Sequence, residues 1–343
     1  MNTWSSGPVF LTGGEFMIRS IHAGSRQTGG FSLNVFTDDE LEDIHLATLE
    51  VLQKTGVFVG DDEAMDVYEG AGAVVDRNNR VVKIPPLVVE DAIQSVPSKF
   101  IACGRTPKND VVLERNRVTF TNFGEGIKII DPYTGEHRPT VKADTANAAR
   151  LVDYLDNLDT YERIMASHDA PHETIALHNA EASLANTSKH HWLGPVNGYC
   201  SRKIVDMLAA IVGGKDKLRE RPLLTFVTCP GSPLTFAKEH CEIIMEAARN
   251  GLAVNIVSMT MAGGSAPVTL AGTLVVLNAE VLGSIVLNQL ICRGSPVVYG
   301  SSTCPIDLWS TTASVGSPEC GMITAGAAQL ARKYAIPCFA AGG

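Results

Sequence analysis

Short apolar runs alternate with longer stretches of helical periodicity throughout the chain beyond Lys142. The longer stretches repeat apolar residues every three or four positions, which predicts amphipathic helices. The short runs are apolar at almost every position, as in parallel strands that are buried on both faces. These predicted strands occupy residues 163–168, 190–196, 223–230, 253–259, 296–302 and 336–341. Strands that alternate with helices indicate βα units and therefore an α/β fold with a parallel sheet.

The chain before this region begins with helices. Thr37 and Glu40 have the spacing of a capping box, and Gly56 provides a stop signal, so a long helix is predicted between them. Shorter helices are predicted over residues 61–71 and 87–95, and the second of these follows a Pro-Pro start. This part of the chain is therefore predicted to be mainly helical.

Residues from about 100 to 141 alternate in polarity with a period of two, which predicts strands. One strand is expected near Phe120, and a further pair is joined by a turn at Pro132–Gly135. We therefore divide the chain into a flexible N-terminal arm, a helical and β-hairpin appendage, and an α/β region. These three parts cover residues 1–32, 33–117 and 118–343.

Two architectures can hold the alternating strands and helices. The strand near Phe120 brings the predicted strands to about seven, whereas a (β/α)8 barrel needs eight. An open doubly wound sheet is the alternative, but no G-x-G-x-x-G fingerprint follows the first strand, and the segment FGEGIKI lacks the third glycine. We therefore favour a (β/α)8 TIM-type barrel that is C-terminally truncated after its seventh strand.

Composition narrows the range of partners and compartments. The net charge of −9 argues against nucleic acid or an anionic membrane surface as the main partner. No uninterrupted apolar run reaches the roughly 18 residues of a membrane span, and no signal peptide is visible. None of the 8 cysteines forms a C-x-x-C pair, so reduced thiols are expected. These features predict a cytoplasmic globular protein.

Polar and aromatic residues gather where the predicted strands end, which is where barrel enzymes place their active residues. The carboxylates at these positions are Glu125, Asp169, Asp307 and Glu319. Helix-dipole compensation is the alternative role for Glu319, because that residue lies in the first turn of a helix. The rings of Tyr299, Trp309 and Phe339 could face a quaternary or protonated amine, with core packing as the alternative for Phe339.

Two further motifs have two interpretations each. His168 and His172 are four residues apart, as in a zinc site on a helix, but Pro171 would begin that helix and leave His168 outside it. We favour a polar helix start without a metal. The segment AGGSAPVTLAG could present backbone N–H groups to an anion at a helix start, or could form a tight turn before the helix.

Several long motifs, in order, resemble those of the trimethylamine:corrinoid methyltransferase family. They include LNVFTDDELEDIHLATLEVL, TCPGSPL, SMTMAGGSAPVTLAGTLVVLNAEVL, VVYGSSTCPIDL and ASVGSPECGMITAGAAQLARKYAIP. The resemblance covers nearly everything from Leu33 to Gly343. It implies a (β/α)8 barrel that moves a methyl group from a methylamine to the cobalt of a corrinoid, as in methanogenesis. The corrinoid belongs to a separate partner protein and is not bound permanently.

The resemblance also implies an expectation about Gly343. Members that use trimethylamine carry pyrrolysine, encoded by an amber codon, after a segment like the terminal AGG. The chain is therefore expected to be a fragment that precedes this codon, inactive in methyl transfer by itself and homo-oligomeric at full length. A glycine betaine-type methyltransferase without pyrrolysine and a non-catalytic truncated barrel are the alternatives. The codon after Gly343 distinguishes them.

Site roles follow from the resemblance as expectations. Asp169, Glu319 and Asp307 are expected to handle protons and hold the cationic amine as catalytic residues. The residues expected to position the substrate are Tyr299, Ser301, Ser302 and Glu125. The rim expected to face the corrinoid consists of Ser258, Met259, Gly263, Gly264 and Ser265.

Overall fold

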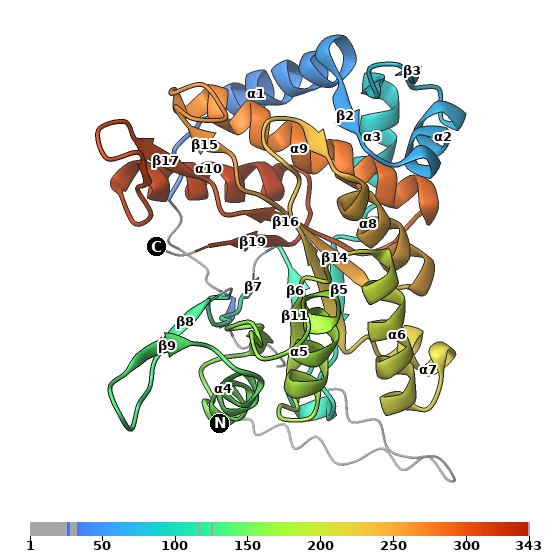
Figure 1. Cartoon of the computed structure of the whole chain (residues 1–343). Helices are drawn as coiled ribbons and strands as arrows, with labels where there is room; N and C mark the ends of the chain where they lie inside the picture. Colours follow the sequence, from blue (N-terminus) through green and yellow to red (C-terminus); the bar gives the residue numbers. More distant parts are fainter. Residues whose placement is uncertain (1–25, 28–32, 116, 125, 342–343) are drawn as a thin grey trace, which may run out of the picture.

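A parallel β-sheet forms the centre of the protein (Figure 1). The computed structural model describes residues 26–27, 33–115, 117–124 and 126–341. Within these residues, neighbouring strands of the sheet are all parallel, in the order β10-β11-β12-β14-β16-β19. The strands are β10 (Thr160–Glu162), β11 (His190–Leu193), β12 (Leu224–Thr228), β14 (Ala253–Ser258), β16 (Val297–Ser301) and β19 (Cys338–Ala340). This order follows the chain without a reversal, as in a barrel, and differs from a doubly wound sheet.

The parallel sheet curls strongly around one face. The ring centroids of Trp192 on β11 and Phe339 on β19 are 5.7 Å apart. Three strands separate β11 from β19, so a flat sheet would hold them about 19 Å apart at ~4.8 Å per strand. The contact therefore requires a sheet bent into part of a barrel, with both rings on its concave side. The predicted α/β fold with a parallel sheet is confirmed in this form.

Helices cover the convex face of the sheet. They are α4 (Lys142–Tyr154), α5 (Ile175–Leu184), α6 (Gly198–Val212), α7 (Lys215–Glu220), α8 (Lys238–Asn250), α9 (Leu270–Ile291) and α10 (Pro318–Lys333), with a short 3-10 turn at His172–Thr174. Phe226, Ile256 and Tyr299 share one hydrophobic cluster with residues of α5 to α10. Neighbouring residues in a strand point to opposite faces of the sheet. The residues directly before and after Phe226, Ile256 and Tyr299 therefore face the concave side.

Helix α9 is the central helix of this layer. It contacts α1 (Asp38–Glu50), α3 (Pro86–Ser95), α8 and α10, and Figure 1 shows it beside α1. Within the described part of the chain, α9 is the one helix long and apolar enough to cross a membrane, and 72% of its most apolar window is buried inside the protein. Asn278, Glu280 and Asn288 interrupt its apolar sequence, so the helix does not contradict the prediction that no uninterrupted apolar run reaches roughly 18 residues.

The N-terminal appendage combines short helices and strands. Besides α1 and α3 it contains α2 (Asp62–Gly70), β2 (Val57–Val59), β3 (Val74–Asp76), β4 (Val81–Lys83), β5 (Lys99–Ala102), β6 (Val111–Glu114) and β7 (Arg117–Val118), with helical turns at Val51–Thr55 and Pro107–Asn109. Strand β7 pairs with β1 (Arg26–Gln27). The remainder of the predicted flexible arm over 1–32 lies outside the described residues. One hydrophobic cluster includes residues of both the appendage and the parallel sheet, so a continuous core crosses the predicted boundary at 117–118.

Helix α1 begins and ends where its sequence signals predict. The Oγ1 atom of Thr37 accepts the backbone N–H of Glu40, and the Glu40 carboxylate accepts the backbone N–H of Thr37 at 2.8 Å. The capping box is therefore confirmed. Gly56, with φ of +79°, ends the element after one π-helical turn, and its N–H bonds the carbonyl of Val51.

Strands outside the parallel sheet form smaller sheets. The predicted pair around Pro132–Gly135 is observed as the antiparallel strands β8 (Lys128–Ile130) and β9 (His137–Pro139). The strand predicted near Phe120 is observed only in part, as β7 at Arg117–Val118. Beyond β7 the carbonyl of Phe120 accepts the N–H of Asp159, and Gly126 forms a parallel bridge with Met165.

Four more short strands follow the parallel strands, in segments that were predicted as loops. They are β13 (Thr235–Phe236), β15 (Met261–Ala262), β17 (Cys304–Asp307) and β18 (Thr312–Ala313). Strand β13 joins the appendage in the sheet β13-β2-β4-β3, whereas β15, β17 and β18 pair with one another. The loops at this edge of the sheet are therefore held by strand pairing.

Candidate functional site

The C-terminal ends of the parallel strands lie at one edge of the sheet, and several predicted site residues meet there. Ser258 at the end of β14 is opposite Ser301 at the end of β16. The N–H of Ser302 bonds the carbonyl of Ser258 at 2.9 Å. The structure therefore brings Ser258, Ser301 and Ser302 together, as expected for neighbouring parallel strands.

The side chain of Ser258 points into the helix layer and bonds a buried carboxylate. Its Oγ donates to Oε2 of Glu280 on α9 at 2.6 Å. The same oxygen accepts from Ser232 at 2.9 Å and from Thr260 at 3.0 Å, and Oε1 accepts the N–H of Leu234 at 3.0 Å. Glu280 therefore ties the segment after β12 to the segment after β14.

Burial and hydrogen bonding act in opposite directions on the pKa of this carboxylate. Glu280 has no exposed surface, and this burial raises its pKa above 4.5, although the hydroxyl of Ser258 and the other donors act in the opposite direction. The sequence analysis did not select Glu280. A signal was present, because Glu280 is the one charged residue within the otherwise apolar or uncharged helix Leu270–Ile291.

Tyr299 also points into the helix layer. Its hydroxyl donates to Oδ1 of Asn278 on α9 at 2.9 Å. Nδ2 of Asn278 in turn donates at 2.8 Å to the hydroxyl of Tyr334, which is the C-cap residue of α10. Burial holds the pKa of Tyr299 well above its usual range. Ser301 is buried as well, and its Oγ accepts the N–H of Thr303. Neither side chain is on the concave side, so we exclude Tyr299 from the site proposed below.

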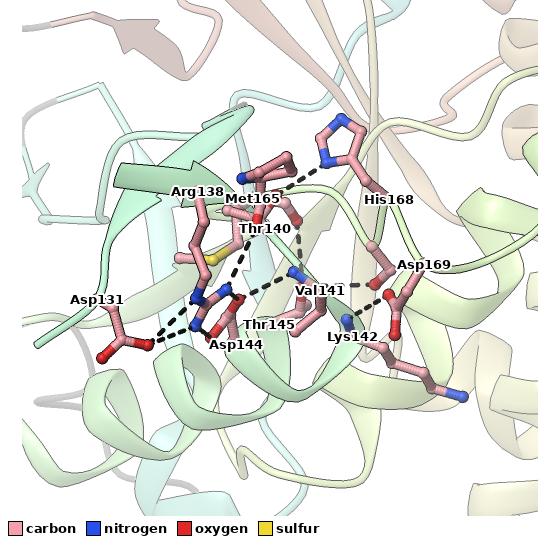
Figure 2. A network of polar contacts seen from close by, with 12 residues as sticks. Asp131, Arg138, Thr140, Val141, Lys142, Asp144, Thr145, Met165, His168 and Asp169 are labelled. Atoms are coloured by element: carbon pink, nitrogen blue, oxygen red, sulfur yellow. Dashed lines mark hydrogen bonds and ion pairs between the residues drawn. The ribbon is translucent and has the colours of Figure 1, made fainter. Parts of the chain in front are cut away.

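Asp169 lies past the end of β10 and is exposed. Its Oδ1 accepts the backbone N–H of Lys142, the first residue of α4, at 2.7 Å. Beside it, Nδ1 of His168 is 2.9 Å from Oγ1 of Thr140, which donates to the carbonyl of Ala166 (Figure 2). These contacts hold the end of β10 against the start of α4. Within the described part of the chain, no three His, Cys, Asp or Glu side chains are grouped as metal ligands.

Arg138 on β9 completes this network. Its guanidinium lies between the carboxylates of Asp131 and Asp144, at 2.9 Å and 2.7 Å (Figure 2). The backbone N–H groups of Tyr133 and Thr134, together with Arg138, lower the pKa of Asp131 to about 2. Hydrogen bonds from Arg138 also lower the pKa of Asp144. The hairpin β8–β9 is thus attached to α4 through one cation.

Replacement of Arg138 by methionine is expected to loosen this hairpin at neutral pH. Both carboxylates have a lowered pKa in the folded state, so their contribution to stability is present above 3.8 and is lost as the pH falls toward about 2. The difference in Tm between the wild type and Arg138→Met should therefore shrink below pH 3.8. Thermal unfolding across this range measures it. An equal Tm for both proteins at pH 7 would contradict the expectation.

The other two predicted catalytic carboxylates lie elsewhere along this edge. Asp307 closes the hairpin between β17 and β18, where it accepts the Oγ–H of Ser310 at 2.6 Å and the N–H of Trp309 at 2.9 Å. The Ser310 hydroxyl is the main cause of the lowered pKa of Asp307. Glu319 is exposed in the first turn of α10. No contact among the described residues joins Asp169, Asp307 and Glu319, and Glu125 lies outside the described residues.

The predicted rim forms a tight turn. Met259 is 53% exposed, and Gly263 adopts a φ of +80°, which favours glycine. The N–H groups of Gly264 and Ser265 bond the carbonyl of Met261, and that of Gly263 bonds the carbonyl of Ala266. These groups are therefore occupied within the turn, which supports the tight-turn interpretation over an anion site.

Together these features define an α/β protein whose parallel sheet winds in one direction and carries polar residues at its C-terminal edge, the arrangement of barrel-type enzymes. Comparison with known proteins specifies the family. The chain belongs to the trimethylamine methyltransferase (MTTB) family, whose sequence model matches residues 23–343. The resemblance seen in the sequence motifs is thereby confirmed.

Three curated proteins illustrate the sequence similarity. The chain is 50% identical over 94% of its length to trimethylamine methyltransferase MttB of Desulfitobacterium hafniense, and 42% identical over 93% to that of Methanosarcina thermophila. It is 33% identical over 90% to a glycine betaine methyltransferase of Desulfitobacterium hafniense. The chain spans 65%, 67% and 64% of these three proteins, about two thirds of their length.

The fold is also found in a solved structure, described as the hydroxylamine complex of MtmB. The TM-score is 0.50 at 16% sequence identity, and the match covers 88% of this chain and 67% of that one. At this identity the likeness supports the curled parallel sheet and its helices alone.

Proposed function

We propose that this chain binds trimethylamine and takes part in moving one of its methyl groups to the cobalt of a corrinoid carried by a partner protein. The observation that carries this proposal is the difference in identity: 50% and 42% to two trimethylamine methyltransferases, against 33% to a glycine betaine methyltransferase. Glycine betaine is the second candidate substrate, since that relative also matches 90% of the chain.

The sheet is proposed to be part of a (β/α)8 barrel. Its strand order is sequential and it curls until Trp192 meets Phe339, as barrel closure requires. The parallel bridge between Gly126 and Met165 supports the segment from Phe120 as the strand next to β10. The amine and the corrinoid would then meet at the C-terminal edge, where the rim around Met259 and Gly263 lies.

The chemistry requires a cationic nitrogen. A neutral tertiary amine is a very poor leaving group, so the nitrogen must gain a proton or another electrophile before its methyl group can move. When the partner protein is docked, its corrinoid would supply a reduced cobalt as the nucleophile that takes the methyl group, and the electron pair of the broken C–N bond would stay on nitrogen. Among the predicted carboxylates we favour Asp169 for the proton, because it is exposed in the segment that follows β10, with Glu319 and Asp307 as second choices.

Ligand preference provides the test. Binding to the chain is measured by titration calorimetry, which reports ligand preference without requiring methyl transfer. We expect trimethylammonium chloride to bind at least about 10-fold more tightly than glycine betaine, a difference of about 1.4 kcal/mol. Tighter binding of glycine betaine would favour the second candidate. Absence of binding by either ligand would contradict both candidates.

A further inference from the structure

Three residues from alternate strands form one layer on the concave side of the sheet. Trp192 lies on β11, Asn255 on β14 and Phe339 on β19, with β12 and β16 between them. Alternate strands contribute the side chains of one layer inside a barrel-like sheet. The 5.7 Å contact between the Trp192 and Phe339 rings is what one shared layer requires. We call these three residues the inner layer.

The inner layer holds polar atoms without a protein partner. Asn255 has no exposed surface, yet neither its Oδ1 nor its Nδ2 makes a hydrogen bond within the described part of the chain. The same holds for Nε1 of Trp192, which is 4% exposed. Buried polar atoms are almost always paired, and an unpaired one lowers stability. Three such atoms in one layer therefore indicate a ligand or ordered water that supplies the missing bonds.

Gly300 makes room for the amide of Asn255. A Cβ atom at Gly300 would lie 2.5 Å from Oδ1 of Asn255, so the amide extends over β16. Gly300 pairs with Phe339 on the next strand, which places the amide oxygen beside the strand that carries the ring. Phe339 is only half-buried, so part of this layer is accessible to solvent.

We propose that the inner layer binds the ammonium group of a protonated methylamine, with Asn255 as a specificity-determining residue. Oδ1 of Asn255 accepts the single N–H of trimethylammonium, and the rings of Trp192 and Phe339 contact its methyl groups. Aromatic ring faces attract alkylammonium ions. An ordered water takes the remaining N–H groups of Asn255 and Trp192. No residue of the inner layer is charged, so the hydrogen bond to Asn255 determines which cation is preferred. This proposal rests on the trimethylamine function above.

Tetramethylammonium distinguishes the hydrogen bond of Asn255 from the contacts with the aromatic rings. It has the same charge as trimethylammonium and also presents methyl groups, but it has no N–H. Titration calorimetry of the chain at neutral pH should show that trimethylammonium binds about 10-fold more tightly than tetramethylammonium. This difference is the effect of one hydrogen bond from a charged donor. Asn255→Leu keeps the branching of the side chain and should abolish this preference, with tetramethylammonium affinity unchanged. Its Tm should not fall, because the amide has no protein partner to lose. Phe339→Leu should weaken both cations equally.

Two more variants complete the experiment. Asn288→Leu on α9 is the control, because its Nδ2 is also buried without a partner among the described residues but lies in the helix layer; it should keep the preference. Asn255→Ala should repeat the loss seen with leucine. If both Asn255 variants still prefer trimethylammonium over tetramethylammonium, this inference is overturned but the proposed function is not. Ordered water would then be the partner of the polar atoms in the inner layer. A lower Tm with loss of both cations in Asn255→Leu would identify a packing residue and overturn it too. A wild type that binds neither cation would overturn the proposed function as well.

Discussion

Replacement of Glu280 by alanine is expected to lower the free energy of unfolding by about 3 kcal/mol. The carboxylate accepts three hydroxyl groups and one backbone N–H, and each buried donor left unpaired costs about 1–3 kcal/mol. The hydroxyls of Ser232 and Ser258 each lie 3.0 Å from that of Thr260, so they recover part of this cost by bonding to one another. Denaturant unfolding monitored by circular dichroism measures the change.

Glutamine at the same position is the matched control. Glu280→Gln keeps the shape and one acceptor oxygen, so a loss of about 1 kcal/mol is expected. Because burial raises the pKa of Glu280 above 4.5, the folded protein holds this proton more tightly than the unfolded chain does. The stability of the wild type relative to Glu280→Gln should therefore decrease as the pH rises from 4.5 through the folded pKa. Equal unfolding curves for the wild type and both variants would show that Glu280 does not hold the two segments.

Gly300→Ala is expected to destabilise the protein by about 3 kcal/mol, at the upper end for an overpacked core. The added Cβ would meet Oδ1 of Asn255 at 2.5 Å, the carbonyl oxygen of Ile256 at 2.6 Å and Cγ2 of Val257 at 2.8 Å. Side chains can move, but the carbonyl of Ile256 belongs to the neighbouring strand β14. Relief therefore requires β14 and β16 to separate in the middle of the sheet. Denaturant unfolding provides the measurement.

Two comparisons test this explanation. Gly321 in α10 has no atom within 4 Å of its added Cβ, so Gly321→Ala should stabilise the helix by about 0.5–1 kcal/mol. Asn255→Ala in the Gly300→Ala background should restore only part of the lost stability, because the backbone contact with Ile256 remains. Full recovery in the double variant would assign the whole effect to the amide and refute the strand-separation argument.

The alternation of strands and helices was predictable because hydrophobic periodicity reflects local geometry. All six predicted apolar runs contain or adjoin a strand of the parallel sheet. The first strand begins earlier than predicted, at Thr160, because its pairing with β11 starts there, opposite the distant residue His190. Strands β13 and β15 were predicted as loops, since the partners that define them lie far away in the sequence.

The site was harder to predict because buried parallel strands lose their alternation. When both faces of a strand are apolar, the sequence does not reveal which residues face the concave side. Tyr299 was therefore expected at the amine but bonds Asn278 in the helix layer, whereas Phe339 lies on the concave side. A usable signal was the isolated polar residue: Asn255 within an apolar strand and Glu280 within an apolar helix are both fully buried.

Pairing of β13 with β2 has a consequence for the order in which the protein is made. Val57–Val59 leaves the ribosome about 180 residues before Thr235–Phe236, its parallel partner. At about 5–20 residues per second, this interval lasts roughly 10–35 s. During that time β2 has only β4 as a partner, and its other edge stays unpaired in the nascent chain. Translation speed and chaperone access between these two segments should therefore influence the yield of folded protein.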